Sequence, residues 1–239
     1  MSKVLLVSSG KGGTGKSMIS VNLGATLAQC GFKVLLVDMD MGLRNIDVYL
    51  GMENKVVYNV MDVMSGVCRI NQAVLRVNGF QSLYFIAASP IKDERDITGL
   101  HMQVLCEKLR DIFDFIIIDA PAGIGDMIDV AAAAAETAIV VTEPDSACLR
   151  DADTTERYLR DRGIDDIRII VNRVNLDLMN QGFLPGIDTI MDLFTGPIIG
   201  WLPEDDNIRV STSRGVPIVM KKGTYLEAAF MEIAKKAVL

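Results

Sequence analysis

The fold is decided by the stretch Ser8-Ser9-Gly10-Lys11-Gly12-Gly13-Thr14-Gly15-Lys16-Ser17. It follows an apolar run at 4–7 and precedes an apolar-periodic segment at 19–27, so a strand, a glycine-rich loop and a helix succeed one another. This context gives the pattern G-x-x-x-x-G-K-[ST] a mechanism, because glycines let successive backbone N–H groups point at an anion and the helix adds its positive N-terminal end. We predict a polyphosphate-binding loop in which Lys16 reaches the β- and γ-phosphates and the Ser17 hydroxyl holds Mg²⁺.

Acidic residues follow two further apolar runs. The run at 34–37 leads to Asp38 and Asp40, and the run at 115–118 leads to Asp119. The second has the Walker B form, a buried strand that brings a carboxylate near the water shell of a metal ion. Because open α/β sheets bind ligands beyond the carboxyl ends of their strands, we expect all three carboxylates beside the phosphates.

Strands alternate with helices along the chain. Further strands are expected at 83–87, 138–142 and 168–173, and a last strand with its exit loop at 198–206. The alternation predicts an α/β fold, a doubly wound, mostly parallel sheet with helices on both faces, of the P-loop NTPase type. Half of the 239 residues are apolar, and no linker, repeat or low-complexity tract interrupts them, so we expect residues 1–239 to form a single domain.

Three of the expected helices stand out. The helix expected at 99–113 has an apolar side formed by Leu100, Val104, Leu105 and Leu109. The last helix starts at Leu226 and carries a side suited to packing on the sheet, formed by Phe230, Ile233, Ala234 and Ala237. The helix at 146–162 is crowded with charges. A solvated face explains most of them, and a docking surface with Asp151 and Asp153 as contacts is the alternative.

Composition excludes several classes of protein. A net charge of −7 argues against a protein whose main task is nucleic-acid binding, since that task rests on basic surface. Four isolated cysteines and the single histidine, His101, favour a reduced cytosolic protein without a structural zinc. We expect no signal peptide, and no apolar run approaches the ~20 residues of a membrane span.

A second lysine within the loop narrows the choice of family. With Lys11, the pattern K-G-G-x-G-K-[ST] resembles the deviant Walker A signature of the MinD/ParA family of ATPases. Segments that resemble the MinD members follow in the same order up to about Pro217, with D-x-G-L-R-N-x-D at 40–47 the most specific. The others are Val57-Tyr58-Asn59-Val60, Asp119-Ala120-Pro121-Ala122-Gly123-Ile124, Arg150-Asp151-Ala152-Asp153 and Leu202-Pro203-Glu204-Asp205.

The resemblance implies a role for individual residues. Lys11 and Lys16 would contact the phosphates of ATP, with Lys11 reaching into the site of a partner subunit. Ser17 would ligate Mg²⁺, Asp38 and Asp119 would hold metal-bound waters, and Asp40 would orient the attacking water. The adenine would lie between Asn172-Arg173 and the loop at 203–205. The nucleotide contacts implied in this way are Lys11, Gly12, Gly13, Thr14, Gly15, Lys16, Ser17, Met18, Asn172, Arg173, Pro203, Glu204 and Asp205.

The same resemblance implies an activity and partners. We expect a slow, Mg²⁺-dependent ATPase that yields ADP and phosphate, forms a homodimer with ATP, and recruits a MinC-like division-site inhibitor to the membrane. A MinE- or DivIVA-linked regulator is implied as well, and no nucleic acid. The protein would be cytoplasmic, with peripheral attachment at the inner face of the cell membrane only through an amphipathic tail that this chain does not include. Two departures from the family pattern are Met18, after the loop, and Gly125-Asp126, where a glutamate is usual.

Three other functions share the fold. A ParA-type partition ATPase would need a basic surface, for which Lys221-Lys222 and Lys235-Lys236 are the candidates near the C-terminus. An iron–sulphur carrier would want cysteines that meet at the dimer axis, commonly a C-x-x-C, which this sequence lacks. A flagellar-number regulator usually has an additional segment before the first strand.

Overall fold

The central feature of the fold is an eight-stranded sheet in the order β3-β4-β2-β5-β1-β6-β7-β8. The computed structural model describes residues 2–42, 44–91 and 97–238. The strands are β1 Lys3–Ser8, β2 Val34–Asp38, β3 Leu75–Arg76, β4 Leu83–Ile86, β5 Phe115–Asp119, β6 Thr137–Thr142, β7 Asp166–Val174 and β8 Ile198–Pro203. All strand pairs are parallel except β3 with β4, which confirms the predicted doubly wound, mostly parallel α/β sheet.

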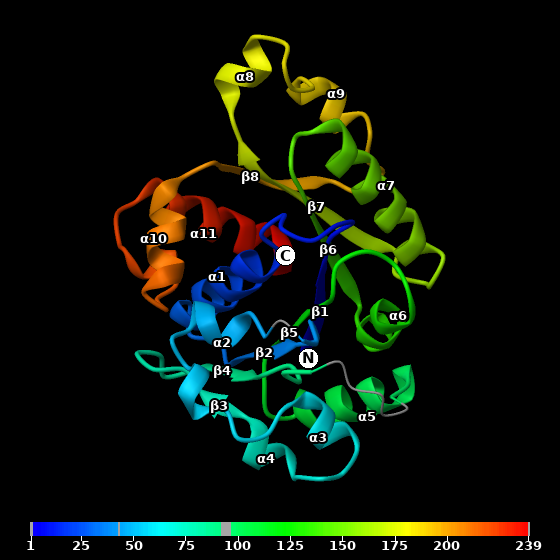
Figure 1. Ribbon diagram of the computed structural model, residues 1–239, viewed down its shortest axis with the longest axis vertical. Coiled ribbons are helices and arrows are strands. Elements are labelled where there is room, and N and C mark those ends of the chain that lie inside the picture. The colour runs from blue at the N-terminus through cyan, green and yellow to red at the C-terminus, as the bar shows by residue number, and fades with distance from the viewer. Residues whose placement is uncertain (1, 43, 92–96, 239) are drawn as a thin grey trace.

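Helices cover both faces of this sheet, as expected. The helices are α1 Lys16–Gln29, α2 Ile46–Tyr49, α3 Val60–Met64, α4 Ile70–Ala73, α5 Gly99–Arg110, α6 Asp126–Ala132, α7 Ser146–Arg160, α8 Leu176–Asn180, α9 Ile187–Met191, α10 Asp206–Ser213 and α11 Tyr225–Val238, with 3-10 turns at Glu53–Lys55 and Ile218–Met220. In Figure 1, α1, α10 and α11 lie to one side of the sheet, and α5, α6 and α7 lie to the other. Two apolar clusters, one on each face, form the core.

The last helix packs as the sequence predicted. Phe230, Ile233, Ala234 and Ala237 are all buried, in the same cluster as the apolar residues of α1. Gly200 of β8 makes this close approach possible, because a Cβ there would lie 2.5 Å from Ile233 Cγ1. The apolar face of α11 is therefore part of the core. Within the described residues, no helix is both long and apolar enough to cross a bilayer.

α3 begins at Val60, because the Asn59 side chain accepts hydrogen bonds from the N–H groups of Met61 and Asp62 and so caps the helix there. The structure corrects one detail of the sequence analysis. On α5, Leu105 and Leu109 are buried as expected, whereas Leu100 and Val104 are 66% and 45% exposed. Periodicity found the apolar side of this helix correctly, yet only part of that side is covered.

Candidate functional site

The phosphate-binding loop joins β1 to α1 at the carboxyl edge of the sheet. Gly13 and Gly15 have φ of 89° and 91°, which an L side chain rarely adopts. The Asn172 amide of β7 donates a 2.8 Å hydrogen bond to the Thr14 carbonyl, and a Cβ on Gly15 would lie 2.3 Å from the same amide nitrogen. Glycine at 15 therefore serves both the backbone turn and the close approach of β7.

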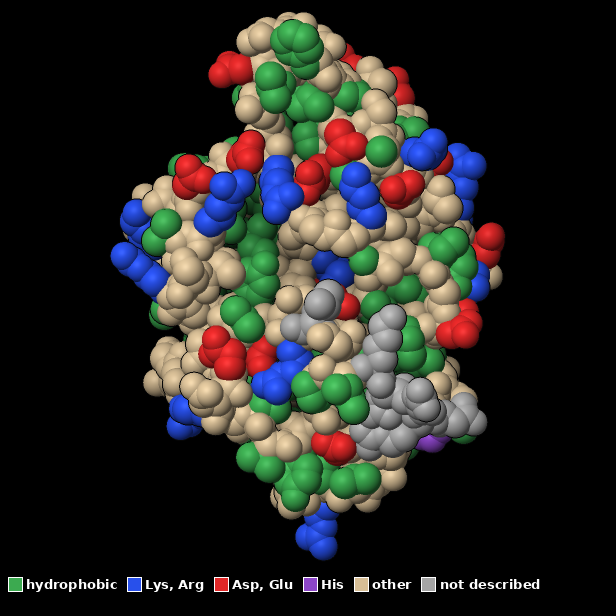
Figure 2. Space-filling model, viewed as in Figure 1, with side chains coloured by type: hydrophobic (Ala, Val, Ile, Leu, Met, Phe, Trp, Pro, Cys, Tyr) green, Lys and Arg blue, Asp and Glu red, His purple; other side chains and the backbone are tan. Residues whose placement is uncertain are grey.

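The loop opens on a cavity of about 980 Å³, and Figure 2 shows a hollow near the middle of this face. Its wall includes most of the loop predicted to bind phosphate, together with Asp40 and Arg173. The full set is Ser9, Gly12, Gly13, Thr14, Gly15, Lys16, Ser17, Met39, Asp40, Met41, Gly42, Asn45, Tyr49, Pro121, Ala122, Met127 and Arg173. A volume of this size is at the upper end of the range for small-molecule sites.

Asp119 contacts three side chains beneath the loop. Its carboxylate accepts hydrogen bonds from Ser17 Oγ at 2.6 Å and Ser20 Oγ at 2.8 Å, and it lies 3.2 Å from Lys16 Nζ. Lys16 Nζ is also 3.8 Å from Asp40 Oδ2. Lys16 is 6% exposed and Asp119 is fully buried, so this ion pair is held away from water. The structure thus brings together Lys16, Ser17, Asp40 and Asp119, as predicted from sequence.

Asp38 lies next to Asp119 because β2 and β5 are neighbours and the two residues are register partners. Its carboxylate accepts hydrogen bonds from three backbone N–H groups, of Asp40 at 2.9 Å and of Asn45 and Ile46 at 3.1 Å. Burial, followed by the charge of Asp119, raises the pKa of Asp38 to about 7. Two carboxylates and a hydroxyl form a set of hard oxygen donors, and such a set fits Mg²⁺.

The segment at 40–47 supports Asp40 from the other side. Asn45 Nδ2 donates to Asp40 Oδ2 at 3.4 Å, and Arg44, with a positive φ of 45°, pairs with Asp47. Leu43, within the motif, lies outside the described residues. Burial raises the pKa of Asp40, against the opposing effect of Lys16. The segment therefore holds one carboxylate at the cavity wall.

A second, smaller cavity of about 310 Å³ adjoins the first and shares Gly15, Tyr49 and Arg173 with it. All the residues expected around an adenine line it, namely Asn172, Arg173, Pro203, Glu204 and Asp205, and Met18 lines it as well. Two buried polar atoms have no hydrogen-bond partner among the described residues: Oγ1 of Thr14, which lines the larger cavity, and Oδ1 of Asn172, which lines the smaller one. Unpartnered buried polar atoms point to a ligand, since such atoms are normally satisfied.

Lys11 lies apart from the other loop residues. Its Nζ is 3.9 Å from Asp145 Oδ1, at the N-terminus of α7, and its side chain is 43% exposed. The hydrogen bond with Cys148, more than any other contact, raises the pKa of Lys11. Lys11 is not among the residues that line the phosphate cavity of its own chain.

Glu143, Asp145 and Cys148 could group around a metal ion, but Glu143 is paired with Arg173 and Asp145 caps α7.

Sequence reasoning missed two residues of the site. Ser20 lies one helical turn after Lys16, so the spacing i, i+4 could have identified it. Tyr49, at the end of α2, lines both cavities, and burial raises the pKa of its hydroxyl. No motif marks Tyr49.

Gly125, which stands where the family usually has a glutamate, also has a local cause. Its φ of 141° is a conformation that glutamate would adopt only with strain.

A glycine loop at a helix N-terminus, with buried acids at the ends of adjacent parallel strands, defines a P-loop NTPase. The ParA family model, described as NUBPL iron-transfer P-loop NTPase, matches residues 1–238. A septum site-determining protein MinD of Synechocystis is 40% identical over 237 residues, which are 99% of this chain and 89% of the relative. The chain belongs to the ParA family and, within it, to the septum site-determining MinD proteins.

Solved structures agree with this assignment. The chain resembles a MinC:MinD cell division complex from Aquifex aeolicus with a TM-score of 0.91 and 32% identity, covering 98% of this chain and 95% of the other. It resembles MinD with Mg-ADP from Pyrococcus horikoshii with a TM-score of 0.87 and 29% identity, covering 99% and 96%. The family resemblance seen in the sequence is confirmed, and the chain is a P-loop ATPase of the MinD type.

Proposed function

We propose that this chain is a slow, Mg²⁺-dependent ATPase that converts ATP to ADP and phosphate and is activated when two ATP-bound copies dimerise. The observation that carries the proposal is the convergence of Lys16, Asp40 and Asp119 at the carboxyl ends of neighbouring strands. Such a reaction needs little covalent chemistry from the protein, since phosphoryl transfer depends mainly on positioning and charge neutralisation.

In the proposed cycle, Lys16 exchanges one anion for another. Its ammonium group is paired with Asp119, and a bound polyphosphate would offer oxygens of the same charge in place of that carboxylate. Asp119 would then be free, with Asp38, to hold metal-bound water, and Ser17 would ligate the metal directly. When bound, Mg²⁺ supplies positive charge to the β- and γ-phosphates.

Asp40 is the residue proposed to orient the attacking water. Its side chain is 17% exposed at the wall of the phosphate cavity, between Lys16 and Asn45. A carboxylate held there by two neighbours can accept a hydrogen bond from water without losing its position. Asp40 would therefore affect the hydrolysis rate more than nucleotide affinity.

The smaller cavity is proposed to take the adenine. The unpartnered Asn172 Oδ1 is a hydrogen-bond acceptor, and the exocyclic amino group of adenine is a donor. Guanine carries a carbonyl at the equivalent ring position, so an unpartnered acceptor favours ATP over GTP. Pro203, Glu204 and Asp205 would close the other side of the base.

The proposals for the dimer and for the partner rest on the family resemblance, on the position of Lys11 and on the exposed charges of α7. Lys11 would act in the site of the second copy, because its side chain lies outside the phosphate cavity of its own chain. A MinC-like inhibitor would dock on α7, where Asp151 and Asp153 are the proposed contacts. Support comes from the relative solved as a MinC:MinD complex. A MinE- or DivIVA-linked regulator remains part of the proposal on the family resemblance alone.

Localisation is proposed as cytoplasmic, with peripheral attachment at the inner face of the cell membrane. We do not assign that attachment to α11, because its apolar residues are in the core. The ParA-type alternative has less support, because Lys222 pairs with Glu227 at 2.9 Å and Lys235 with Glu232 at 2.6 Å. Both candidate basic pairs are thus partly neutralised.

The test is light scattering with an Asp40→Ala variant, which should bind ATP without hydrolysing it. With Mg²⁺ and ATP its molecular mass should double, and with ADP it should remain that of a monomer. Asp188→Ala, which changes an exposed acid of α9, is the matched control and should hydrolyse ATP at the normal rate. A mass that ATP leaves unchanged would contradict the dimerising switch, and full activity of Asp40→Ala would contradict its assigned role.

A further inference from the structure

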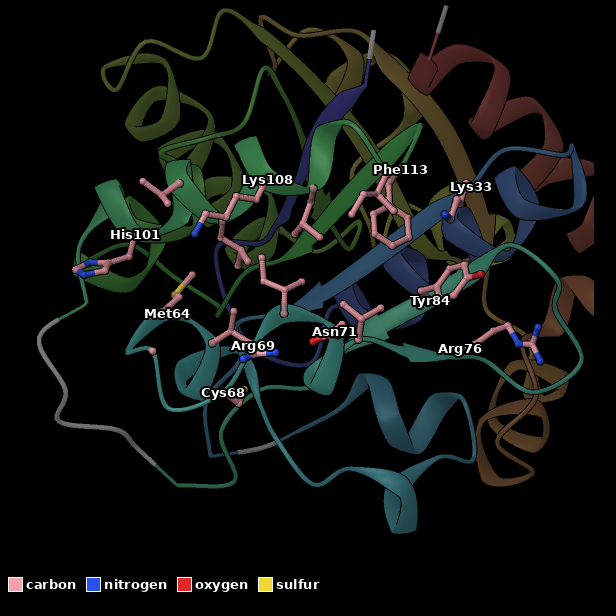
Figure 3. A pocket seen from close by; sticks show the side chains of 18 of the residues that line it. Lys33, Met64, Cys68, Arg69, Asn71, Arg76, Tyr84, His101, Lys108 and Phe113 are labelled. Atoms are coloured by element: carbon pink, nitrogen blue, oxygen red, sulfur yellow. The ribbon is translucent and has the colours of Figure 1, made fainter.

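A groove of about 920 Å³ lies outside the phosphate cavity, between α5 on one wall and α3, α4 and β4 on the other (Figure 3). It is at the β3–β4 edge of the sheet, opposite β8. None of the residues that line it also lines the phosphate cavity. The catalytic site therefore does not account for this groove.

The walls of the groove are mainly apolar. From α5 and its C-terminal turn come Leu100, Val104 and Ile112, which are 66%, 45% and 47% exposed. Met64 of α3 and Ile70 of α4 also line the groove. Exposed apolar residues that gather in one groove on a soluble protein surface are a feature of interaction sites, whereas single ones are common everywhere.

The rim of the groove is basic. Among the described residues that line it, four are cationic, Lys33, Arg69, Arg76 and Lys108, and none is Asp or Glu, although the protein has a net charge of −7. Within the described ranges, Arg69, Arg76 and Lys108 form no ion pair. Lys33 Nζ lies over the rings of Tyr84 and Phe113, 5.7 and 5.3 Å from their centroids.

The cations are spread along the groove. In Figure 3, Lys33 and Arg76 are at one end, Lys108 is on the upper wall, Arg69 is on the lower wall, and His101 is at the far end. A ligand with one anionic head group would need its cations gathered at one point. Cations on both walls and at an end instead fit a ligand with several carboxylates along its length.

We propose that this groove docks an acidic amphipathic helix of a partner protein. The apolar walls would receive side chains spaced i, i+4 and i+7 on that helix, and the basic rim would pair with the carboxylates beside them. The 12 residues of α5 form a wall about 18 Å long, which matches roughly three turns of an incoming helix. Since the groove shares no residue with the phosphate cavity, binding would occur with either nucleotide.

The first test uses a fluorescein-labelled, helix-stapled peptide of about 14 residues, with leucines spaced i, i+4 and i+7 and glutamates beside them. Fluorescence anisotropy should show it binding at least ~10-fold more tightly than the same peptide with lysines for glutamates, and salt should weaken it. Equal binding of the two peptides, or no binding of either, would overturn the proposal. Displacement of the bound acidic peptide by oleate, with tighter binding of oleate, would assign the groove to lipid instead.

The second test compares variants of the full chain. Arg69→Glu with Lys108→Glu should weaken the acidic peptide at least ~10-fold, and Leu100→Gln should weaken it several-fold. The first control, Lys221→Glu with Lys236→Glu, has the same net charge as Arg69→Glu with Lys108→Glu. The second control, Val57→Gln, matches Leu100→Gln, because it changes an apolar residue that is 79% exposed and lies outside the groove. All variants should melt near the wild-type temperature and hydrolyse ATP normally. Loss of binding in the controls as well would refute the proposal, whatever the outcome for the ATPase.

Discussion

The Asn172 amide and the Thr14 carbonyl are joined by a 2.8 Å hydrogen bond that ties β7 to the phosphate-binding loop. The oxygen of the same side chain is buried and has no hydrogen-bond partner among the described residues, and Asn172 lines the smaller cavity. One residue thus fixes the loop and, in the proposed binding mode, would offer an acceptor to the base. The loop and the smaller cavity are consequently joined by one side chain, although Thr14 and Asn172 are 158 residues apart in sequence.

We predict that Asn172→Ala raises the Kd for ATP about tenfold, because it removes one loop contact and one acceptor, each worth about 0.5–1.5 kcal/mol. Isothermal titration calorimetry measures this directly. Asn180→Ala, at the exposed end of α8, is the control and should bind ATP as the wild type does. An unchanged Kd for Asn172→Ala would remove this residue from the nucleotide site.

Lys16→Ala should weaken ATP binding by a few kcal/mol, since it removes a desolvated charge partner of the phosphates. It should also destabilise the nucleotide-free fold, because Asp119 stays buried without its cation. Equilibrium urea unfolding in the absence of nucleotide tests the second effect, and Lys55→Ala on the surface provides the comparison. A variant that binds ATP with wild-type affinity would refute the phosphate-loop assignment.

Lys11→Ala should abolish ATP-driven dimerisation and hydrolysis together, while a single chain retains most of its affinity for ATP. The reason is that the Lys11 side chain lies by Asp145 and not in the cavity of its own chain. Light scattering and a fluorescent ATP analogue separate the two properties. Loss of nucleotide affinity as severe as that of Lys16→Ala would show that Lys11 acts within its own subunit.

The chain as given should bind anionic liposomes only weakly, even with Mg²⁺ and ATP. Exposing the apolar face of α11 would uncover Phe230 and Ile233, which are fully or almost fully buried, at a cost near 25 cal/mol per Å². Co-sedimentation with ATP and with ADP measures this. Strong, ATP-dependent sedimentation would mean that α11 leaves the core.

Gly10→Ala should destabilise the fold by roughly 1–3 kcal/mol, because the added Cβ would lie 2.4 Å from the Asp151 carbonyl carbon. Gly12→Ala is the matched control, since no atom of the described residues lies within 4 Å of a Cβ there and the φ of Gly12 is not positive. Urea denaturation of the two nucleotide-free variants should separate them clearly. Equal stabilities would show that α7 can move away from the loop at little cost.

The sequence predicted the site residues that directly follow the ends of strands. An apolar run followed by an acid located Asp38 and Asp119, and the alternation of elements implied that parallel strands would bring them to one edge. It could not predict that Lys11 turns toward α7, since side-chain direction depends on tertiary neighbours. Nor could periodicity show that Leu100 stays exposed, because a pattern identifies the apolar side of a helix and not what covers it.

The contact between Gly10 and Asp151 has a mechanical consequence. Unlike Gly13 and Gly15, Gly10 has no positive φ, so its small size is required by the backbone of α7 and not by the turn. The backbone of α7 thus packs directly against the first glycine of the loop. A partner protein that moves α7 away from Gly10 would remove this contact and leave the loop less constrained. A movement of the loop toward α7 would, in turn, displace the helix. Mechanical force could therefore pass directly between the loop and α7, without a hinge or a moving domain.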